Sequence, residues 1–208
     1  EGGVNNDKYT IDDPKDNLKT IACIGGNGGL SIRYNSERHF FYEAALLFKA
    51  SSFGYGFKGK EFNSYTGGNQ FLSLPFRAGY YLKLSDKFII SPIAGIVPSY
   101  IISYASTGGE VDFLGGGTTY QSNYAPRNLN KRFTAFVQTG ISFDLLSVRR
   151  LRISINPNYY WGTNKITIYD IDYTVSNNPG SVKAAMNDYG SCFNFNFGVK
   201  YLLPQKKK

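Results

Sequence analysis

The chain has 208 residues, which is enough for one sizeable β domain and short for two. Aromatic residues make up 16% of the sequence and glycine occurs 23 times, a balance that favours strands and turns over helices. No window holds the roughly 18 uncharged apolar residues of a spanning helix, which excludes a helical membrane protein. The net charge of +8 comes from scattered Lys and Arg, which argues against nucleic-acid binding.

The N-terminal part of the chain gives the weakest pattern. Residues 1–18 lack the basic and apolar regions of a signal peptide, so we expect a processed or truncated chain. They also lack a clear alternation, and we expect an extracellular loop or an irregular N-terminal segment there. Residues 20–34 are glycine-rich and predict a strand less strongly than the segments that follow.

Alternating apolar and polar residues predict the remaining strands, because successive side chains of a strand point to opposite faces. In FNFNFGVKYLL (193–203), for example, Phe193, Phe195 and Phe197 share one face, and Asn194 and Asn196 share the other. The predicted strands cover residues 20–34, 40–50, 72–84, 88–104, 133–145, 151–162 and 190–203. Each is at least as long as the ~9 to 11 residues of a tilted strand that crosses a membrane.

The connections between these strands alternate in length. Short turns fall at NSER (35–38), SDK (85–87) and SVRR (147–150), and long loops fall at 55–69, 105–131 and 163–189. This sorting is typical of bacterial outer-membrane barrels, whose short turns are periplasmic and whose long loops are extracellular. We therefore predict a single all-β domain over 1–208, an antiparallel up-and-down transmembrane β-barrel with a periplasmic C-terminus and tail (205–208).

Seven strands are one too few, because single-chain bacterial barrels have an even number. We expect eight, and three explanations compete for the eighth. It precedes residue 1, it lies irregularly within residues 1–18, or it is KITIYDIDYTV (165–175). We favour the first and interpret 165–175 as a strand extension or small hairpin in a loop. A strand between 20–34 and 190–203 would hold Cys23 and Cys192 too far apart to bond, so we predict two free thiols.

Two segments resemble a known family. The run FLSLPFRAGYYLKLSDKFIISPIAGIVPSYIIS (71–103) is similar to the central hairpin of the PorT-like or OmpA-like outer-membrane β-barrels of Bacteroidota-type bacteria. The preceding strand FFYEAALLFKAS carries Glu43 where that family has an inward glutamate. The resemblance implies an outer-membrane barrel and suggests a place in a secretion or outer-membrane assembly machine. The positions of the hairpin that carry it are Leu72, Pro75, Phe76, Arg77, Pro92 and Gly95.

Charged residues lie on the polar faces of the predicted strands. An eight-stranded barrel is narrow enough to be filled by side chains, so these charges must pair or contact trapped water. We predict interior ion pairs between Glu43 and Arg77 and between Asp144 and Arg152, with Lys200 among the interior charges. A static polar core is the favoured interpretation, and a gate or proton path is the alternative. The complete set is Arg33, Glu43, Lys49, Arg77, Lys83, Asp144, Arg152 and Lys200.

Aromatic residues lie near both ends of the predicted strands on the apolar face. In a membrane barrel they would form two girdles at the lipid interfaces, whereas in a soluble sheet they would pack across strands. We favour girdles, made of Tyr34, Phe40, Tyr42, Tyr100, Tyr104, Tyr159, Trp161 and Tyr201.

The sequence argues against catalysis. The only histidine, His39, lies at a predicted short turn, away from the long loops where an outer-membrane enzyme would need its base. GGNGG (25–29) fails the spacing of a phosphate-binding loop and continues a strand.

We therefore expect no enzyme, no cofactor and no metal. The expected function is that of a structural or interaction subunit of an envelope complex, with outer-membrane lipid and other envelope proteins as partners and no nucleic acid. A narrow channel or small-solute-binding barrel is one alternative. A soluble ligand-binding β-barrel, with the apolar face as its core, is another.

Overall fold

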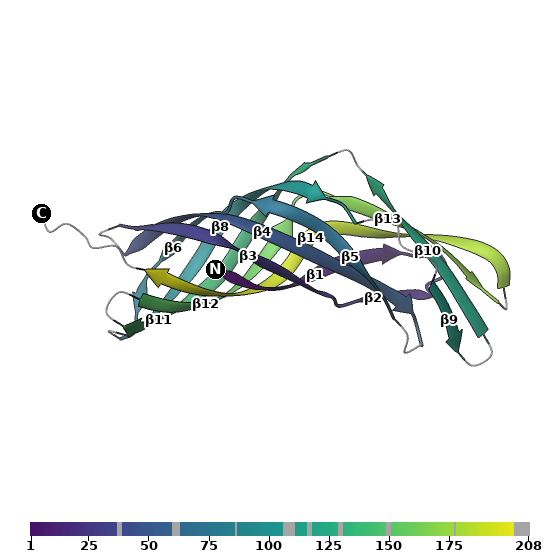
Figure 1. The fold of residues 1–208 in the computed structure, drawn as a ribbon, viewed down its shortest axis with the longest axis horizontal. Helices are drawn as coiled ribbons and strands as arrows, with labels where there is room; N and C mark the ends of the chain where they lie inside the picture. The colour runs from purple at the N-terminus through teal and green to yellow at the C-terminus, as the bar shows by residue number, and fades with distance from the viewer. Residues whose placement is uncertain are drawn as a thin grey trace, which may run out of the picture.

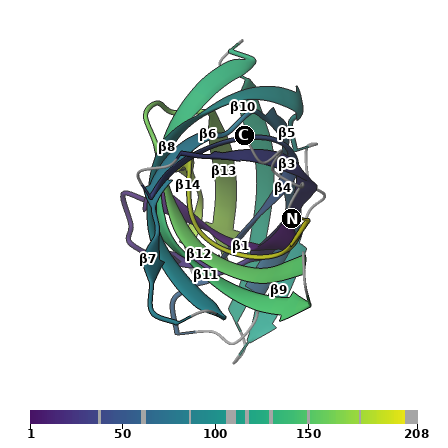
Figure 2. The ribbon, with the colours of Figure 1, turned by 90° about the vertical axis from the view of Figure 1, so that its left-hand side faces the viewer.

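Eight antiparallel strands form a closed ring in the computed structural model, which describes residues 1–36, 39–59, 63–85, 87–105, 111–115, 118–128, 131–148, 151–176 and 178–201 (Figure 1). The strands follow the order of the chain, and β1 pairs with β14 to close the ring (Figure 2). The all-β, up-and-down architecture is therefore confirmed. The ring consists of β1 (Gly2–Asp12), β3 (Ile24–Asn35), β4 (Phe40–Phe57), β5 (Asn63–Ser73), β8 (Phe88–Ser103), β11 (Phe133–Val148), β12 (Leu151–Gly162) and β14 (Asn178–Tyr201).

Shorter strands complete the sheet. β6 (Phe76–Tyr80) pairs with β4 and β8, and β7 (Leu82–Lys83) pairs with β8, so both continue the path of β5. β2 (Leu18–Ile21) pairs with β4. β9 (Val111–Gly115), β10 (Thr118–Asn128) and β13 (Thr167–Val175) lie beyond the ring. Among the described residues, no helix is long and apolar enough to cross a membrane.

The eighth strand lies within residues 1–18, and the preferred explanation that it precedes residue 1 was wrong. β1 pairs with β3 on one side and with β14 on the other, with one irregularity in its register between Asp7 and Tyr9, so the second explanation is correct and this segment is not a loop. Its alternation is masked because Asn6, Lys8 and Thr10 are polar although they point outward, while Asn5 and Asp7 point into the barrel. A strand with two polar faces carries no hydrophobic period.

The barrel wall places apolar side chains outside and polar side chains inside. On the outer surface, Leu74 is 47% exposed and Ile153 is 44% exposed, whereas Arg77 and Asn156 are buried in the lumen. A soluble barrel requires the reverse arrangement. The outward residues of adjacent strands form a continuous apolar belt, in which Leu46, Leu72, Ile96, Val137 and Phe197 are among the exposed residues.

One end of the barrel carries the short connections after β3, β7 and β11, and we call it the turn end. The other, the extended end, was expected to carry long loops, but strands continue there instead. β4 runs on to Phe57, and β13 pairs with both β10 and the first half of β14. The interpretation of 165–175 as a strand extension is thus correct. The predicted tail at 205–208 lies outside the described residues.

The strand extensions form two facing parts, which we call the cap. One part contains β2 with the ends of β4 and β5, and the other contains the end of β1 with β14, β13, β10 and β9 (Figure 1). The two parts pack against each other through a hydrophobic cluster at the mouth of the barrel. That cluster includes Leu18, Phe53, Tyr55, Phe57, Tyr124, Tyr169, Ile171, Tyr173 and Met186.

Candidate functional site: a filled lumen below an aromatic cap

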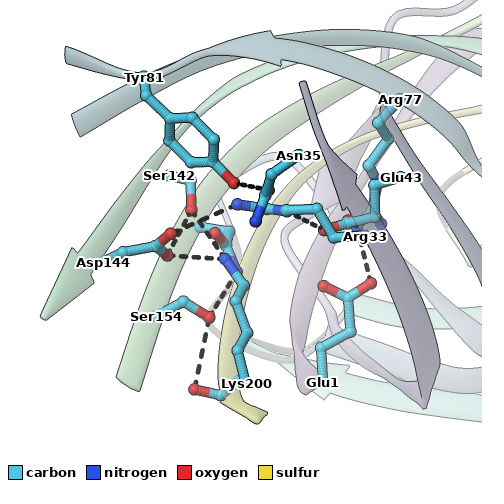
Figure 3. A network of polar contacts seen from close by, with 12 residues as sticks. Glu1, Arg33, Asn35, Glu43, Arg77, Tyr81, Ser142, Asp144, Ser154 and Lys200 are labelled. Carbon is cyan, nitrogen blue, oxygen red and sulfur yellow. Dashed lines mark hydrogen bonds and ion pairs between the residues drawn. The ribbon is translucent and has the colours of Figure 1, made fainter. Parts of the chain in front are cut away.

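A network of ion pairs fills the lumen at the turn end (Figure 3). Glu43 on β4 accepts from two guanidinium groups, with Arg33 Nε at 2.7 Å and Arg77 Nη1 at 2.6 Å. Asp144 on β11 likewise accepts from Lys200 Nζ at 2.7 Å and from Arg33 Nη1 at 3.3 Å. Arg33 therefore links the two carboxylates across the lumen, and one connected network joins strands from opposite walls.

Two predicted pairs have different outcomes. The structure brings Glu43 and Arg77 together, because register places them opposite each other on β4 and β6. It does not pair Asp144 with Arg152. These residues sit on neighbouring strands near the same turn, but Asp144 turns toward Lys200 and Arg33, whereas Arg152 Nε is buried without a hydrogen-bond partner in the described part of the chain. The register explains this, since Ser154 lies opposite Asp144 and Arg152 lies opposite Leu146.

The N-terminal segment adds charges that the sequence did not place in the lumen. Glu1 Oε1 accepts from Arg77 Nη1 at 2.8 Å, and Arg77 Nε also donates to Gln138 Oε1 at 3.0 Å. At the turn end, a cavity of about 900 Å³ is lined by Arg33, Glu43, Asp144 and Lys200 of this network and also by Arg152. Residues 1–18 were expected to form an extracellular loop or an irregular segment, and the position of Glu1 in the lumen at the turn end corrects that expectation.

A belt of amide side chains occupies the middle of the lumen. Asn156 and Asn196 are opposite each other on β12 and β14, and Asn158 and Asn194 are opposite each other two residues further along. All four are buried, and each has a buried amide atom with no hydrogen-bond partner among the described protein atoms. Buried amides of this kind normally bind ordered water. The belt therefore forms the polar middle layer of the lumen.

A single lysine closes the lumen above the amide belt. Lys49 Nζ lies 3.1 Å from Asp7 Oδ1 and 3.1 Å from Cys192 Sγ. It also lies within 6 Å of three ring centroids, at 5.5 Å from Phe71, 5.5 Å from Phe136 and 5.9 Å from Tyr160. A paired ammonium group surrounded by aromatic faces is well compensated for its burial.

Both cysteines are buried and free, as predicted. The strand between them is β1, since β3 and β14 each pair with it. Cys192 is one of the contacts of Lys49, whereas Cys23 precedes β3.

The cap seals the extended end with aromatic rings. Phe53 on β4 packs against rings from the other part of the cap, with centroid distances of 4.1 Å to Tyr169 and 5.4 Å to Tyr124. The Tyr55 hydroxyl lies 3.0 Å from Ser122 Oγ, also across the interface. The buried rings of the cluster are less than a tenth exposed, so they form a packed aromatic core. This core was not predicted from the sequence, because it joins segments that were expected to be separate loops.

Strand β14 passes through every layer of the lumen in turn. Its inward residues begin with Lys200 in the ion-pair network and continue with Asn196 and Asn194 in the amide belt. Cys192 then contacts Lys49, and Met186 belongs to the cap core. Charged, amide and aromatic layers therefore follow one another along the barrel.

The predicted aromatic girdle residues lie mostly on the outer surface. At the turn end, Tyr34, Tyr42 and Tyr201 are more than half exposed and Phe40 nearly so.

Toward the extended end, Trp161 is exposed and Tyr159 is half-buried, with their ring centroids 4.6 Å apart. Tyr100 packs edge to face on Phe133. Tyr104 differs, because it follows the end of β8 and packs against the inner cluster around Phe71.

The structure also shows where the remaining predicted residues lie. Lys83 is exposed near the turn end, and so is His39, which adopts a positive φ of 64°. The inward pattern at 40–50 and 72–84 brought Glu43, Lys49 and Arg77 into the lumen as expected.

Comparisons with known proteins agree with this architecture. A family model described as "outer membrane protein beta-barrel domain" matches residues 1–167. The crystal structure of the outer membrane protein OprG from Pseudomonas aeruginosa is similar, with a TM-score of 0.50 and 11% sequence identity, over 96% of this chain and 92% of that chain. The search of curated proteins found no match. These findings support a bacterial outer-membrane barrel.

Proposed function

This chain belongs to the outer membrane protein beta-barrel family, and we propose that it is a closed, non-catalytic barrel that acts through contacts made by its cap. In this proposal it is a structural or interaction subunit of an envelope complex. The observation that carries it is the packed aromatic core of the cap, which joins segments that were expected to be separate loops. Rigid scaffolds that carry exposed segments commonly serve for binding.

The proposal includes the orientation of the barrel in the outer membrane. Short turns of outer-membrane barrels face the periplasm, so the turn end and the C-terminus are periplasmic and the cap is extracellular. The resemblance of residues 71–103 to PorT-like barrels suggests a specific form of the proposal, in which the complex is a secretion or outer-membrane assembly machine.

The filled lumen favours this function over that of an open channel. A permeating solute would have to separate the ion pairs around Glu43, displace Lys49 from Asp7 and part the rings of the cap. The turn-end cavity of about 900 Å³ is the one observation that favours the channel or small-solute alternative. Planar-bilayer recording of the refolded protein separates the two. We expect no conductance steps, and reproducible single-channel steps would support the channel.

The outer face of the cap offers charges for a partner. Arg127 pairs with Asp170 on this face, and Asp172 and Lys183 are exposed beside them around a hollow of about 650 Å³. Chemical crosslinking in native membranes, followed by purification, tests for a stoichiometric partner. Asp172→Lys with Lys183→Glu should abolish capture without changing the heat-modifiable mobility of the barrel.

The matched control for that experiment is Lys87→Asp, which reverses an exposed charge at the turn end. It should leave capture unchanged. Equal capture by the cap variant and the wild type would contradict a role for this face.

The proposal also holds that no reaction is catalysed. The only histidine is exposed at the turn end, where it contacts the ring of Tyr80 and no carboxylate of the described residues is hydrogen-bonded to it. A general base for acyl transfer or proteolysis needs a positioned partner of this kind.

A further inference from the structure

A hollow of about 600 Å³ lies on the outside of the barrel toward the extended end, where β1, β2 and β14 meet. Phe193, which is 48% exposed, forms part of its wall and belongs to the lipid-facing belt. Lys8 and Thr10 contribute from β1, which is polar on its outward face here. The hollow therefore adjoins the edge of the apolar belt, at the level where lipid headgroups meet a membrane barrel.

Two lysines are held over tyrosine rings at this edge. Lys8 Nζ lies 5.0 Å from the ring centroid of Tyr159, and Lys165 Nζ lies 5.9 Å from that of Tyr189. Both lysines are exposed, and Tyr189 is a wall of the hollow. The rings restrict the long lysine side chains and so lower the entropic cost of presenting their ammonium groups to a ligand.

The polar groups around the hollow suit an anion. Asn6, Thr10, Thr20 and Ser191 supply amide or hydroxyl donors beside Lys8. Asp7 also lines the hollow, but its side chain has no exposed surface and its carboxylate pairs with Lys49 on the lumen side. Lys8 is therefore the exposed charged side chain among the described residues that line the hollow, whereas Asp12, the next outward residue of β1 after Thr10, lines a separate hollow.

We propose that this hollow, with Lys8 and Lys165, binds the phosphate headgroup of a membrane lipid. A lipid fits better than a free anion, because the site combines phosphate donors with the exposed aromatic surface of Phe193 and Trp161, along which acyl chains can lie. Positively charged residues near a membrane surface each contribute to the binding of anionic lipids. The proposal does not depend on the function proposed for the cap.

Native mass spectrometry of the full chain in detergent tests the site. The probe is diphosphorylated lipid A, compared with dephosphorylated lipid A that carries the same acyl chains. The wild type should retain the phosphorylated form preferentially, and Lys8→Gln with Lys165→Gln should lose roughly fivefold in affinity for each lysine removed. Lys8→Arg with Lys165→Arg should restore the preference.

The control is Lys15→Gln with Lys87→Gln, which removes two other exposed lysines and should leave retention unchanged. Heat-modifiable mobility confirms that every variant is folded. Equal retention of the two lipids by the folded wild type would overturn the proposal. So would an unchanged preference in the folded Gln variant, or displacement of the lipid by an equal concentration of inorganic phosphate, which would indicate a site for free anions.

Discussion

The hydroxyl of Tyr173 on β13 donates a 2.9 Å hydrogen bond to Asp13 Oδ1 in the turn between β1 and β2. The same carboxylate accepts from the backbone N–H groups of Asn17, Leu18 and Lys15, at 2.7, 2.9 and 3.1 Å. One side chain thus both shapes the turn and fastens it to the second part of the cap. Figure 1 shows β2 and β13 at the same end of the barrel.

Acid should loosen this turn. Partial burial alone would raise the pKa of Asp13, but the hydrogen bonds from the Leu18, Lys15 and Asn17 backbone and from Tyr173 hold that pKa below its ordinary value. Because the folded state binds the proton less tightly, the stabilisation is complete above the unfolded pKa of about 3.9 and is lost as the pH falls through the lower folded value. We expect Asp13→Asn to cost about 1–2 kcal/mol of unfolding free energy at neutral pH.

Urea unfolding in lipid vesicles between pH 2 and pH 8 measures this effect. The difference between wild type and Asp13→Asn should be constant above about pH 5 and shrink below about pH 4. A difference that persists undiminished at the lowest pH would show that the carboxylate charge is not what holds the turn.

High pH should also weaken the hydrogen bond between Tyr173 and Asp13. Burial, followed by the hydrogen bond to Asp13, raises the pKa of Tyr173 to about 12. A raised pKa favours the neutral phenol in the folded state, so this stabilisation is complete below the ordinary pKa of about 10 and is lost as the pH rises through the folded value. Ultraviolet difference titration measures the formation of phenolate in the wild type and in Tyr173→Phe. Compared with the wild type, the curve of the variant should lack one tyrosine among those that titrate at the highest pH.

Removing one partner of the Glu43–Arg77 ion pair should lower the free energy of unfolding strongly. Glu43→Ala leaves Arg77 and Arg33 buried with one carboxylate fewer, and breaking a buried pair costs about 3–5 kcal/mol. The double variant Glu43→Ala, Arg77→Ala should lose less than the sum of the single variants, with a coupling of about 1–3 kcal/mol. Arg127→Ala, which removes an exposed pair with Asp170, is the control and should cost less than about 1 kcal/mol.

A double-mutant cycle from equilibrium unfolding in vesicles measures all four states. Strict additivity would contradict a direct interaction between Glu43 and Arg77. It would indicate that Glu1 and Gln138, the other partners of Arg77, carry its contribution.

The two predicted ion pairs show what sequence can and cannot determine in a barrel. Glu43 and Arg77 were matched correctly because they lie at comparable depth on consecutive strands, whose register places them opposite each other. Lys200 reaches Asp144 from a strand that is not its neighbour, because β12 lies between β11 and β14. Such contacts across the lumen depend on strand tilt and stagger, which no local pattern encodes.

The strands themselves were predictable where one face meets lipid. Alternation located the other seven strands, and their predicted bounds at the turn end agree with the observed ones within a few residues. At the extended end, β4, β5 and β14 run several residues beyond the predicted ranges. It failed for β1, whose outward residues Asn6, Lys8 and Thr10 are polar. It also failed to predict the cap core, because the rings of Phe53 and Tyr169 belong to segments far apart in the sequence and their packing is a tertiary property.

A glycine in the wall should control the packing of the turn end. A Cβ built at Gly79 would lie 2.3 Å from the ring of Phe41, which is fully buried and lies 3.8 Å from the Arg33 guanidinium. Gly79→Ala would push this ring into the ion-pair network, and such overpacking costs about 1–3 kcal/mol. Gly180→Ala is the matched control, since a Cβ there has nothing within 4 Å.

Unfolding midpoints in urea should therefore fall for Gly79→Ala and stay near the wild-type value for Gly180→Ala. An unchanged midpoint for Gly79→Ala would mean that Phe41 can move without disturbing Arg33.

The aromatic core of the cap should be separable from the barrel. Phe53→Ala removes a fully buried ring that contacts Tyr9, Tyr124 and Tyr169, and large cavities of this kind cost about 3–5 kcal/mol. Because Phe53 lies beyond the closed ring, we expect the loss to appear in the cap, as faster cleavage by added protease between β9 and β14. Heat-modifiable mobility, which reports the barrel, should be unchanged.

Phe133→Ala provides the comparison, because Phe133 is 80% exposed on the outer face and fills no internal space. Its cleavage pattern should match that of the wild type. Conductance measured on the same samples extends the test, since a loosened cap still leaves Lys49 paired with Asp7 and the network around Glu43 in place. Phe53→Ala should therefore remain silent in planar bilayers. Open-channel steps in that variant alone would show that the cap is the principal barrier, and that the ion pairs below it do not close the lumen.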